Sequence, residues 1–76
     1  MYGQKIYRFS IDLSAAQLLE IYRGSVHRVR VRTFEGLVLD LDAERFKPFT
    51  TREGIQGTFT LTVSGENRFV SLVKLN

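Results

Sequence analysis

The sequence contains no cysteine, one histidine and one proline among its 76 residues. Without cysteine, no disulfide can form and no thiolate can serve as a nucleophile or a metal ligand. A single imidazole, that of His27, is too little for a structural zinc site. A chain of this length buries only about 60% of the surface that it exposes when unfolded, so its core is small. We therefore expect a domain that depends on aliphatic and aromatic packing, with no metal and no cofactor.

Long apolar stretches are missing as well. The longest apolar runs are three residues, as at positions 37–39, whereas a membrane-spanning helix needs about 20. Residues 1–8 contain no apolar signal sequence, and Tyr2 stands where myristoylation requires glycine. These absences predict a cytoplasmic protein without a membrane segment, and the lack of cysteine is consistent with a reducing compartment.

The residues that are present match an ordinary folded domain. Hydrophobic residues make up 43% and charged residues 25% of the chain, which is typical of globular rather than disordered proteins. No internal repeat or linker divides the chain, so we expect a single domain over residues 1–76. Eleven lysine and arginine residues against eight aspartate and glutamate residues leave a formal charge of +3, and this excess mildly favours anionic partners.

The first part of the chain predicts a strand and a helix. Apolar and polar residues alternate over residues 6–13, as in a half-buried strand. Ser14 and Gln17 match a capping box, and Gly24 is typical of a helix end. A helix of about ten residues is therefore expected between them. The side chains expected on its buried face are Ala15, Leu18, Leu19 and Tyr22.

A hairpin is predicted next. Residues 26–33 and 37–42 alternate in the same way and flank Phe34-Glu35-Gly36, a three-residue loop with glycine at the left-handed position. The apolar faces of the two strands then set the register. Position 31 lies opposite 39, 29 opposite 41, 30 opposite 40 and 28 opposite 42.

The remaining residues predict a short helical turn over residues 43–49, which Pro48 ends, a polar loop over residues 50–57, and a second hairpin. Gly65-Glu66 is interpreted as a two-residue turn between strands at 58–63 and 68–75. The expected partners are Phe59 with Leu72 and Leu61 with Val70, with Phe69, Ser71 and Val73 on the opposite face. The resulting α+β fold has five mainly antiparallel strands in a curled sheet or partly open small barrel, with one helix from the N-terminal half packed on it.

Three arginines, Arg28, Arg30 and Arg32, project from one face of a single predicted strand. Their separation of about 6.6 Å along the strand suits a phosphate backbone or another acidic partner. The same register sets Asp40 beside Arg30 and Asp42 beside Arg28, so ordinary cross-strand ion pairs are the alternative. Only Arg32 lacks an opposing carboxylate.

A second basic segment interleaves the cations Arg45, Lys47 and Arg52 with the aromatic residues Phe46 and Phe49. Proteins that bind single-stranded nucleic acids combine aromatic stacking with cations in this way. The alternative is that both phenylalanines belong to the core of a domain that has little core to spare. A further aromatic residue at the predicted hairpin tip, Phe34, is either folded back over the sheet or exposed for contact.

The sequence offers little for catalysis. His27 aligns with the apolar Val29 and Val31, so we expect a histidine that is partly buried or has its hydrogen bonds satisfied, rather than a general base. Asp40 and Asp42 share a face, but the neighbouring arginines would keep both ionised. No Ser-His-Asp set or phosphate-binding loop is present, and Gly54-Ile55-Gln56-Gly57 is interpreted as a turn rather than a nucleic-acid clamp. We therefore expect a protein that is not an enzyme.

The order of the elements and several motifs resemble a known family. The motifs are Tyr7-Arg8-Phe9-Ser10 in the first strand, a helix ending in Tyr22-Arg23-Gly24, an arginine–valine strand, residues 45–57 and a closing hairpin. Over nearly the whole chain they are similar to the short bacterial proteins collected as domain of unknown function twenty-eight thirty-five, and the most specific stretch is residues 46–57. The resemblance implies a stand-alone cytoplasmic bacterial protein of this size. It implies no activity, and no functional residue carries over from it.

Three functional hypotheses follow. The first is a non-enzymatic module that binds nucleic acid, with Phe34 stacking on a base and with phosphate contacts from Arg28, Arg30, Arg32, Arg45, Lys47 and Arg52. The second is a protein-interaction module or homodimer that pairs through its C-terminal strand and the face carrying Phe69 and Val73. The third, a small-ligand or catalytic domain, requires a concave pocket with convergent polar groups, of which the sequence shows no sign.

Overall fold

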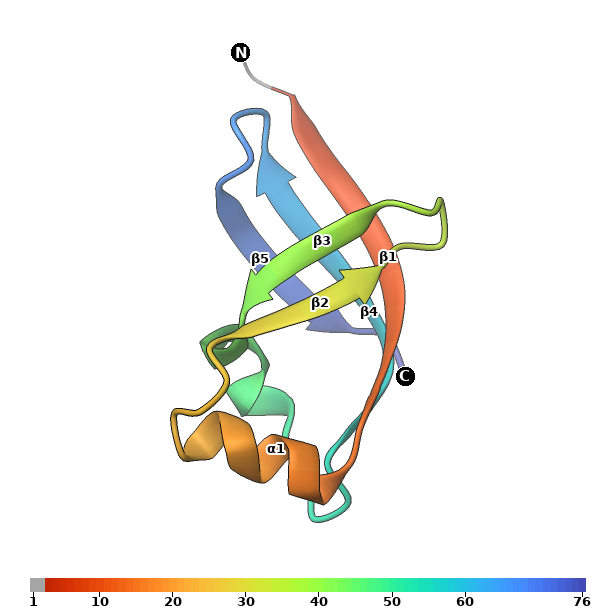
Figure 1. The fold of residues 1–76 in the computed structure, drawn as a ribbon. Helices are drawn as coiled ribbons and strands as arrows, with labels where there is room; N and C mark the ends of the chain where they lie inside the picture. The colour runs from red at the N-terminus through yellow and green to blue at the C-terminus, as the bar shows by residue number, and fades with distance from the viewer. Residues whose placement is uncertain (1–2) are drawn as a thin grey trace.

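The computed structural model describes residues 3–76, which form five strands, one α-helix and one 3-10 helix (Figure 1). In chain order the elements are β1 (Gln4–Leu13), α1 (Ala15–Tyr22), β2 (Arg28–Arg32), β3 (Val38–Asp42), η1 (Ala43–Phe49), β4 (Ile55–Ser64) and β5 (Phe69–Lys74). The predicted α+β class with five antiparallel strands is confirmed. The predicted helical turn is also confirmed as η1, although it includes Pro48 and ends at Phe49.

The strands belong to two sheets, which corrects the prediction of one curled sheet or small barrel. One sheet has the order β1-β4-β5, and β2 and β3 form a separate hairpin. The hairpin crosses in front of the larger sheet (Figure 1), and within residues 3–76 its backbone meets β1 only at an isolated bridge between Phe9 and Thr33, the residue after β2. In the part of the chain that the structure describes, β3 and β5 share no backbone pairing. The strands therefore do not close into a barrel.

The core lies between the two sheets, with the helices α1 and η1 at one end (Figure 1). Phe9, Phe46, Phe59 and Ile55 are fully buried there. The rings of Phe9 and Phe59 stack with centroids 5.9 Å apart, and Phe46 meets Phe59 edge-on at 5.9 Å. Phe49 also lies edge-on to Phe59, at 5.2 Å. Of the two interpretations of the basic segment, a core role for both phenylalanines is therefore the correct one.

Helix α1 begins with the predicted capping box. Ser14 Oγ accepts a hydrogen bond from the Gln17 backbone N–H at 3.2 Å, and Gln17 Oε1 accepts one from the Ser14 N–H at 2.9 Å. The helix ends before Gly24, whose φ of +81° is the expected left-handed conformation. The predicted buried face was wrong in part, because Leu18 and Ile21 carry the contact with the core while the remaining members of the predicted face are exposed. These are Ala15, Leu19 and Tyr22.

The predicted register of the β2–β3 hairpin is confirmed at every position. Gly36 has a φ of +97°, as the three-residue loop requires. The strand is shorter than the predicted range of 26–33, however, and begins at Arg28. His27 therefore lies in the preceding loop and is exposed, so the expectation of a partly buried histidine was wrong. Its carbonyl oxygen accepts a hydrogen bond from the Ala43 N–H at 2.9 Å.

The register of the last hairpin differs from the prediction. The turn uses three residues, 65–67, and Asn67 takes the left-handed position with a φ of +67°. A bulge follows, so that Leu61 lies opposite Leu72 and Val63 lies opposite Phe69. Because one extra residue in a strand exchanges its two faces, Phe69 lies on the core side, opposite to its predicted face.

The polar loop predicted over residues 50–57 is also shorter. It ends at Gly54, because Ile55 pairs with Leu13 and is fully buried as the first residue of β4. The Gln56 side chain donates a hydrogen bond from Nε2 to the Leu13 carbonyl oxygen at 3.1 Å. The glycine pair at 54 and 57 therefore belongs to a strand start, as expected, and not to a clamp between two helices.

Candidate nucleic-acid interface

Three exposed arginines project from the outer face of β2. Arg28, Arg30 and Arg32 alternate with the buried Val29 and Val31. Their guanidinium groups therefore lie on the side of the hairpin that faces away from the core. This arrangement is the one that the alternating sequence predicts.

Among the residues that the structure describes, a carboxylate neutralises only one of these arginines. Arg30 Nε lies 3.2 Å from Asp40 Oδ1, in a pair that solvent reaches on both sides. Asp42 is opposite Arg28 as predicted, but its Oδ1 accepts a hydrogen bond from the Glu44 backbone N–H at 3.0 Å and caps η1 instead. Within residues 3–76, Arg28 and Arg32 thus take part in no ion pair.

The neighbouring strand adds a cation that the sequence analysis missed. The bridge between Phe9 and Thr33 places Arg8 of β1 next to Phe34 on the outer face, and the Phe34 N–H donates a hydrogen bond to the Arg8 carbonyl oxygen at 2.9 Å. Arg8 and Phe34 line a shallow depression of about 370 Å³ together with Ile6 and Glu35. Arg8 lies on the polar face of its strand, but nothing local in the sequence tells which strand lies beside it.

Phe34 is the most exposed aromatic ring of this surface. It is 64% exposed, so of the two alternatives for the hairpin tip, the exposed ring is correct. Arg32 of β2 belongs to the same surface, because the bridge between Phe9 and Thr33 sets it beside Ser10 of β1. We call the face formed by Arg8, Arg32 and Phe34 the outer basic face.

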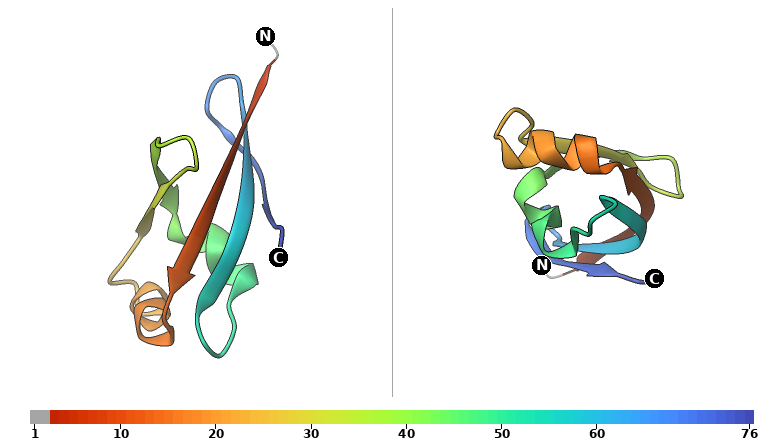
Figure 2. Two further views of the ribbon diagram at one scale, coloured as in Figure 1. Left: turned by 90° about the vertical axis from the view of Figure 1, so that its right-hand side faces the viewer. Right: turned by 90° about the horizontal axis from the view of Figure 1, so that it is seen from below.

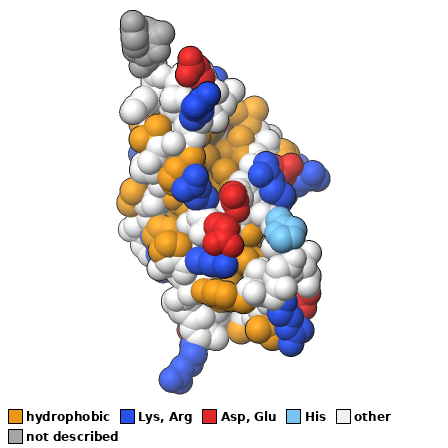
Figure 3. Space-filling model, turned by 90° about the vertical axis from the view of Figure 1, so that its left-hand side faces the viewer, with side chains coloured by type: hydrophobic (Ala, Val, Ile, Leu, Met, Phe, Trp, Pro, Cys, Tyr) orange, Lys and Arg blue, Asp and Glu red, His pale blue; other side chains and the backbone are white. Residues whose placement is uncertain are grey.

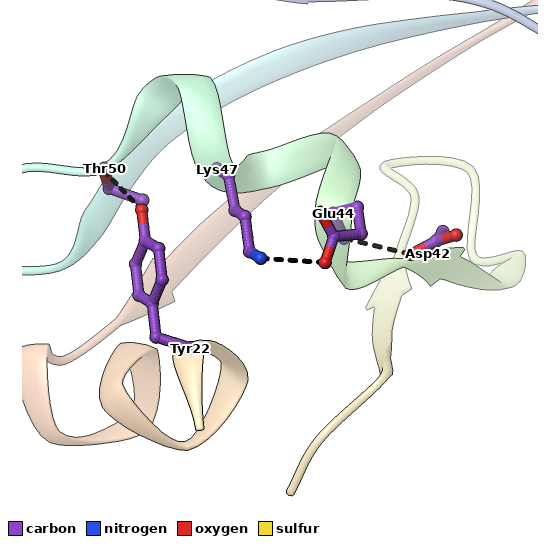
Figure 4. Close-up of polar contacts among 5 residues, drawn as sticks. All are labelled: Tyr22, Asp42, Glu44, Lys47 and Thr50. Atoms are coloured by element: carbon purple, nitrogen blue, oxygen red, sulfur yellow. Dashed lines mark hydrogen bonds and ion pairs between the residues drawn. The ribbon is translucent and has the colours of Figure 1, made fainter. Parts of the chain in front are cut away.

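The cations of the second basic segment lie elsewhere. Lys47 Nζ is 2.8 Å from Glu44 Oε2 and 5.1 Å from the centre of the Tyr22 ring (Figure 4). The hydrogen bond to Glu44 is the main cause of a pKa of Lys47 that is raised above its usual value of 10.5. The Tyr22 hydroxyl and Thr50 Oγ1 are 3.3 Å apart beside it (Figure 4). Lys47 therefore connects η1 to α1 rather than facing a ligand on the outer basic face.

Arg45 and Arg52 are also separate from the outer basic face. The Arg45 guanidinium carbon lies 3.9 Å from the centre of the Phe69 ring, in cation–π geometry. Arg52 belongs to the loop between η1 and β4, at the lower end of the molecule in Figure 1, whereas the β2–β3 loop lies at the upper right. The structure therefore divides the six predicted contact residues among four places: the outer face of β2, the contact of Lys47 with Tyr22, the contact of Arg45 with Phe69, and the loop that contains Arg52.

Phe69 and Val73, predicted to share one interaction surface, face different sides. Phe69 lines a groove of about 180 Å³ between β5 and the β2–β3 hairpin, where hydrophobic side chains are exposed in a hollow (Figure 3). Val73 lies opposite Thr60 on the outer side of the larger sheet. The groove also contains charges of both signs, those of Arg28, Arg45, Asp40 and Asp42.

Two further features bear on chemistry. Over residues 3–76 no three His, Cys, Asp or Glu side chains gather in a way that could hold a metal ion. In the same residues, each buried side-chain nitrogen or oxygen has a hydrogen-bond partner, so none is left aimed at a ligand. What the outer basic face can do is attract an anion and offer an aromatic plane.

None of the helices described here has the length and apolar character needed to cross a membrane. Residues 5–75 match the model of a family described as "Protein of unknown function (DUF2835)". No curated protein and no solved structure matches the chain.

Proposed function

We propose that the chain, which belongs to the DUF2835 family of proteins of unknown function, is a non-enzymatic module that binds single-stranded nucleic acid on the outer basic face. The observation that carries this proposal is the exposed Phe34 ring held beside Arg8, with Arg32 on the same face. The function proposed is binding, and no chemical step is assigned to any residue.

The chemistry of the face fits this ligand. Successive bases of a single strand stack on aromatic side chains, while cations contact the phosphates between them. Arg8 and Arg32 take part in no ion pair within residues 3–76, so their charge is available to a phosphate. Arg28 extends the same cationic row along β2, whereas Arg30 is partly neutralised by Asp40.

A single strand fits better than a duplex. The ring of Phe34 can stack only on a base whose face is open, and the bases of a duplex are covered by their neighbours. Phe34 lies in the loop between β2 and β3 and not on a helix. Within residues 3–76, neither α1 nor η1 presents the row of cations with which a helix binds in a major groove.

The proposal is tested by fluorescence-anisotropy titration of labelled single- and double-stranded DNA and RNA, at low and near-physiological salt. We expect saturable binding to single strands that weakens log-linearly with salt. The double variant Arg8→Ala/Arg32→Ala removes two phosphate contacts, so the slope of log K against log salt should become shallower by about 1.4. Phe34→Ala should weaken binding by about 1–3 kcal/mol with little change in slope, because stacking involves no counterion release.

The matched control is Arg23→Ala/Arg52→Ala. It removes the same charge from the end of α1 and from the loop after η1, both at the lower end of the molecule (Figure 1). A nonspecific effect of net charge would flatten the slope equally in both double variants and would contradict the assigned face. Absence of binding to single strands even at low salt would refute the proposal as a whole.

A further inference from the structure

The open edge of β5 is the feature from which we draw a further inference. Among residues 3–76, β5 pairs with β4 alone, and it lies at the outer margin of the molecule (Figure 2, left). The Leu75 N–H donates a hydrogen bond to the Thr58 carbonyl oxygen at 2.7 Å. Because alternate residues of a strand point their backbone groups to opposite edges, the N–H and C=O groups of Leu72 and Lys74 face the open side. These are the groups that an additional strand would bind.

Of the features by which proteins usually prevent such pairing, β5 has the bulge near its start and one lysine, Lys74, at its end, and it contains no proline and no acidic residue. Around it, Val70 is 47%, Val73 51% and Leu75 53% exposed. A second strand would cover these apolar side chains as well as the free backbone groups.

The open edge of β3, in contrast, does not suit a second copy. Its residues alternate as Val38, Leu39, Asp40, Leu41 and Asp42. In a two-fold antiparallel pairing centred on Asp40, the carboxylates of the two Asp40 residues would face each other, and like charges directly opposite destabilise a strand pair. Self-pairing is therefore disfavoured at β3 by charge.

We propose that β5 is the interface with a second copy of this chain, paired antiparallel about a two-fold axis at Leu72. This register sets Ser71 opposite Val73 of the second copy and Val70 opposite its Lys74, so that no like charges meet. The two three-stranded sheets become one continuous sheet of six strands. Because the two-fold axis of this antiparallel pair is perpendicular to the sheet, the outer sides of the two three-stranded sheets lie on the same side of the six-stranded sheet. The small core of the monomer makes such added burial useful for stability.

The first measurement is the mass in solution without nucleic acid, by sedimentation equilibrium over a wide range of protein concentration. We expect a reversible rise from the chain mass of 8.8 kDa towards twice that value. Val70→Lys would place a lysine opposite Lys74 at both symmetry-related positions and should weaken the dimer about three- to tenfold. Val70→Glu would place a carboxylate opposite each Lys74 and should strengthen it by a similar factor.

Leu19 of α1 provides the matched control, because it is also 47% exposed but lies on another element. Leu19→Lys and Leu19→Glu should leave the dissociation constant unchanged. A wild-type chain that stays monomeric at all concentrations would overturn the proposal, and so would equal weakening by both Val70 variants. Masses that grow beyond a dimer would overturn it too, because they indicate head-to-tail pairing.

A second measurement needs no variant. In the dimer the Leu72 N–H binds the facing strand, whereas in the monomer it faces solvent. Its hydrogen exchange, followed by NMR, should slow as the protein concentration rises, while the Leu75 N–H, already bonded to Thr58, should change little. An exchange rate of Leu72 that does not depend on concentration would refute the interface. Since no nucleic acid is present, this outcome is independent of the proposed binding function.

Discussion

At the scale of the single residue, Gly54 determines how the last part of the chain joins the first. Its φ is +108°, and a Cβ at this position would collide with the Leu13 carbonyl oxygen. Gly36 also has a positive φ, of +97°, but its missing Cβ points into open space. Gly54 is therefore required by its backbone conformation and by the close approach of β1, whereas Gly36 is required by its backbone conformation alone. The close approach allows Ile55 to start β4 directly opposite Leu13.

We expect this difference to be measurable as free energy of unfolding. Gly36→Ala should cost about 1–2 kcal/mol, the price of a left-handed conformation for a residue with a Cβ. Gly54→Ala should cost more, above about 3 kcal/mol, because the backbone of β1 must also move. Chemical denaturation of both variants gives the comparison, with Gly3→Ala as a control at a position where an added Cβ would meet no other atom within 4 Å. Equal losses for Gly36→Ala and Gly54→Ala would contradict the role of the close approach.

At the scale of the element, the two hairpins show how similar turns are encoded by different residues. In the first, Thr33 N–H binds the Leu37 carbonyl and Gly36 takes the left-handed position; in the second, Ser64 N–H binds the Arg68 carbonyl at 2.8 Å. Asn67 holds the left-handed position of the second turn. Gly65 indicated a turn of two residues, whereas the turn has three. This extra residue in the turn, together with the bulge, places Phe69 on the face opposite to the predicted one.

Helix α1 provides the element-scale prediction. It has only eight residues, too few to be stable without its caps and its contact with the core. Ser14→Ala removes the acceptor for the Gln17 N–H and should lower the free energy of unfolding by about 1 kcal/mol. The control is Ser25→Ala, at an exposed serine beyond the helix. Thermal or urea denaturation measures both, and an equal effect of the two substitutions would mean that the cap contributes nothing specific.

At the scale of the whole molecule, the aromatic cluster of Phe9, Phe46 and Phe59 connects elements that no sheet joins. The β2–β3 hairpin meets the larger sheet through one bridge, yet its Val29 and Val31 are buried in the same core. A hairpin alone is marginal in water. The stability of the hairpin therefore depends on the aromatic cluster. Because the hairpin carries Arg32 and Phe34, the outer basic face depends on the same cluster.

We therefore expect the two sheets to unfold in one cooperative transition. Backbone circular dichroism and the near-ultraviolet signal of the tyrosines should give the same midpoint. Phe46→Ala should lower that midpoint for both probes together, at a cost of about 3–5 kcal/mol. A hairpin that melts before the larger sheet would separate the two curves and contradict a shared core.

The sequence alone was sufficient where local pattern and chemistry decide the outcome. Alternation placed the three arginines of β2 on the solvent side, a capping box marked the start of α1, and Gly36 set the register of the central hairpin. In each case the determining residues are close together in the chain. The family resemblance was likewise correct, since residues 5–75 match the family model.

What only the tertiary structure decided involves residues far apart in the chain. The contact of Arg8 with Phe34 arises because β1 meets the β2–β3 hairpin. The capping of η1 by Asp42 leaves Arg28 without an ion pair among residues 3–76, and the bulge in β5 places Phe69 on the core side. Alternation determines which face of a strand a side chain takes, but packing determines which strand lies beside it. The sequence thus determined the elements and most of their faces, while the outer basic face and the open edge of β5 exist only through the arrangement of those elements in space.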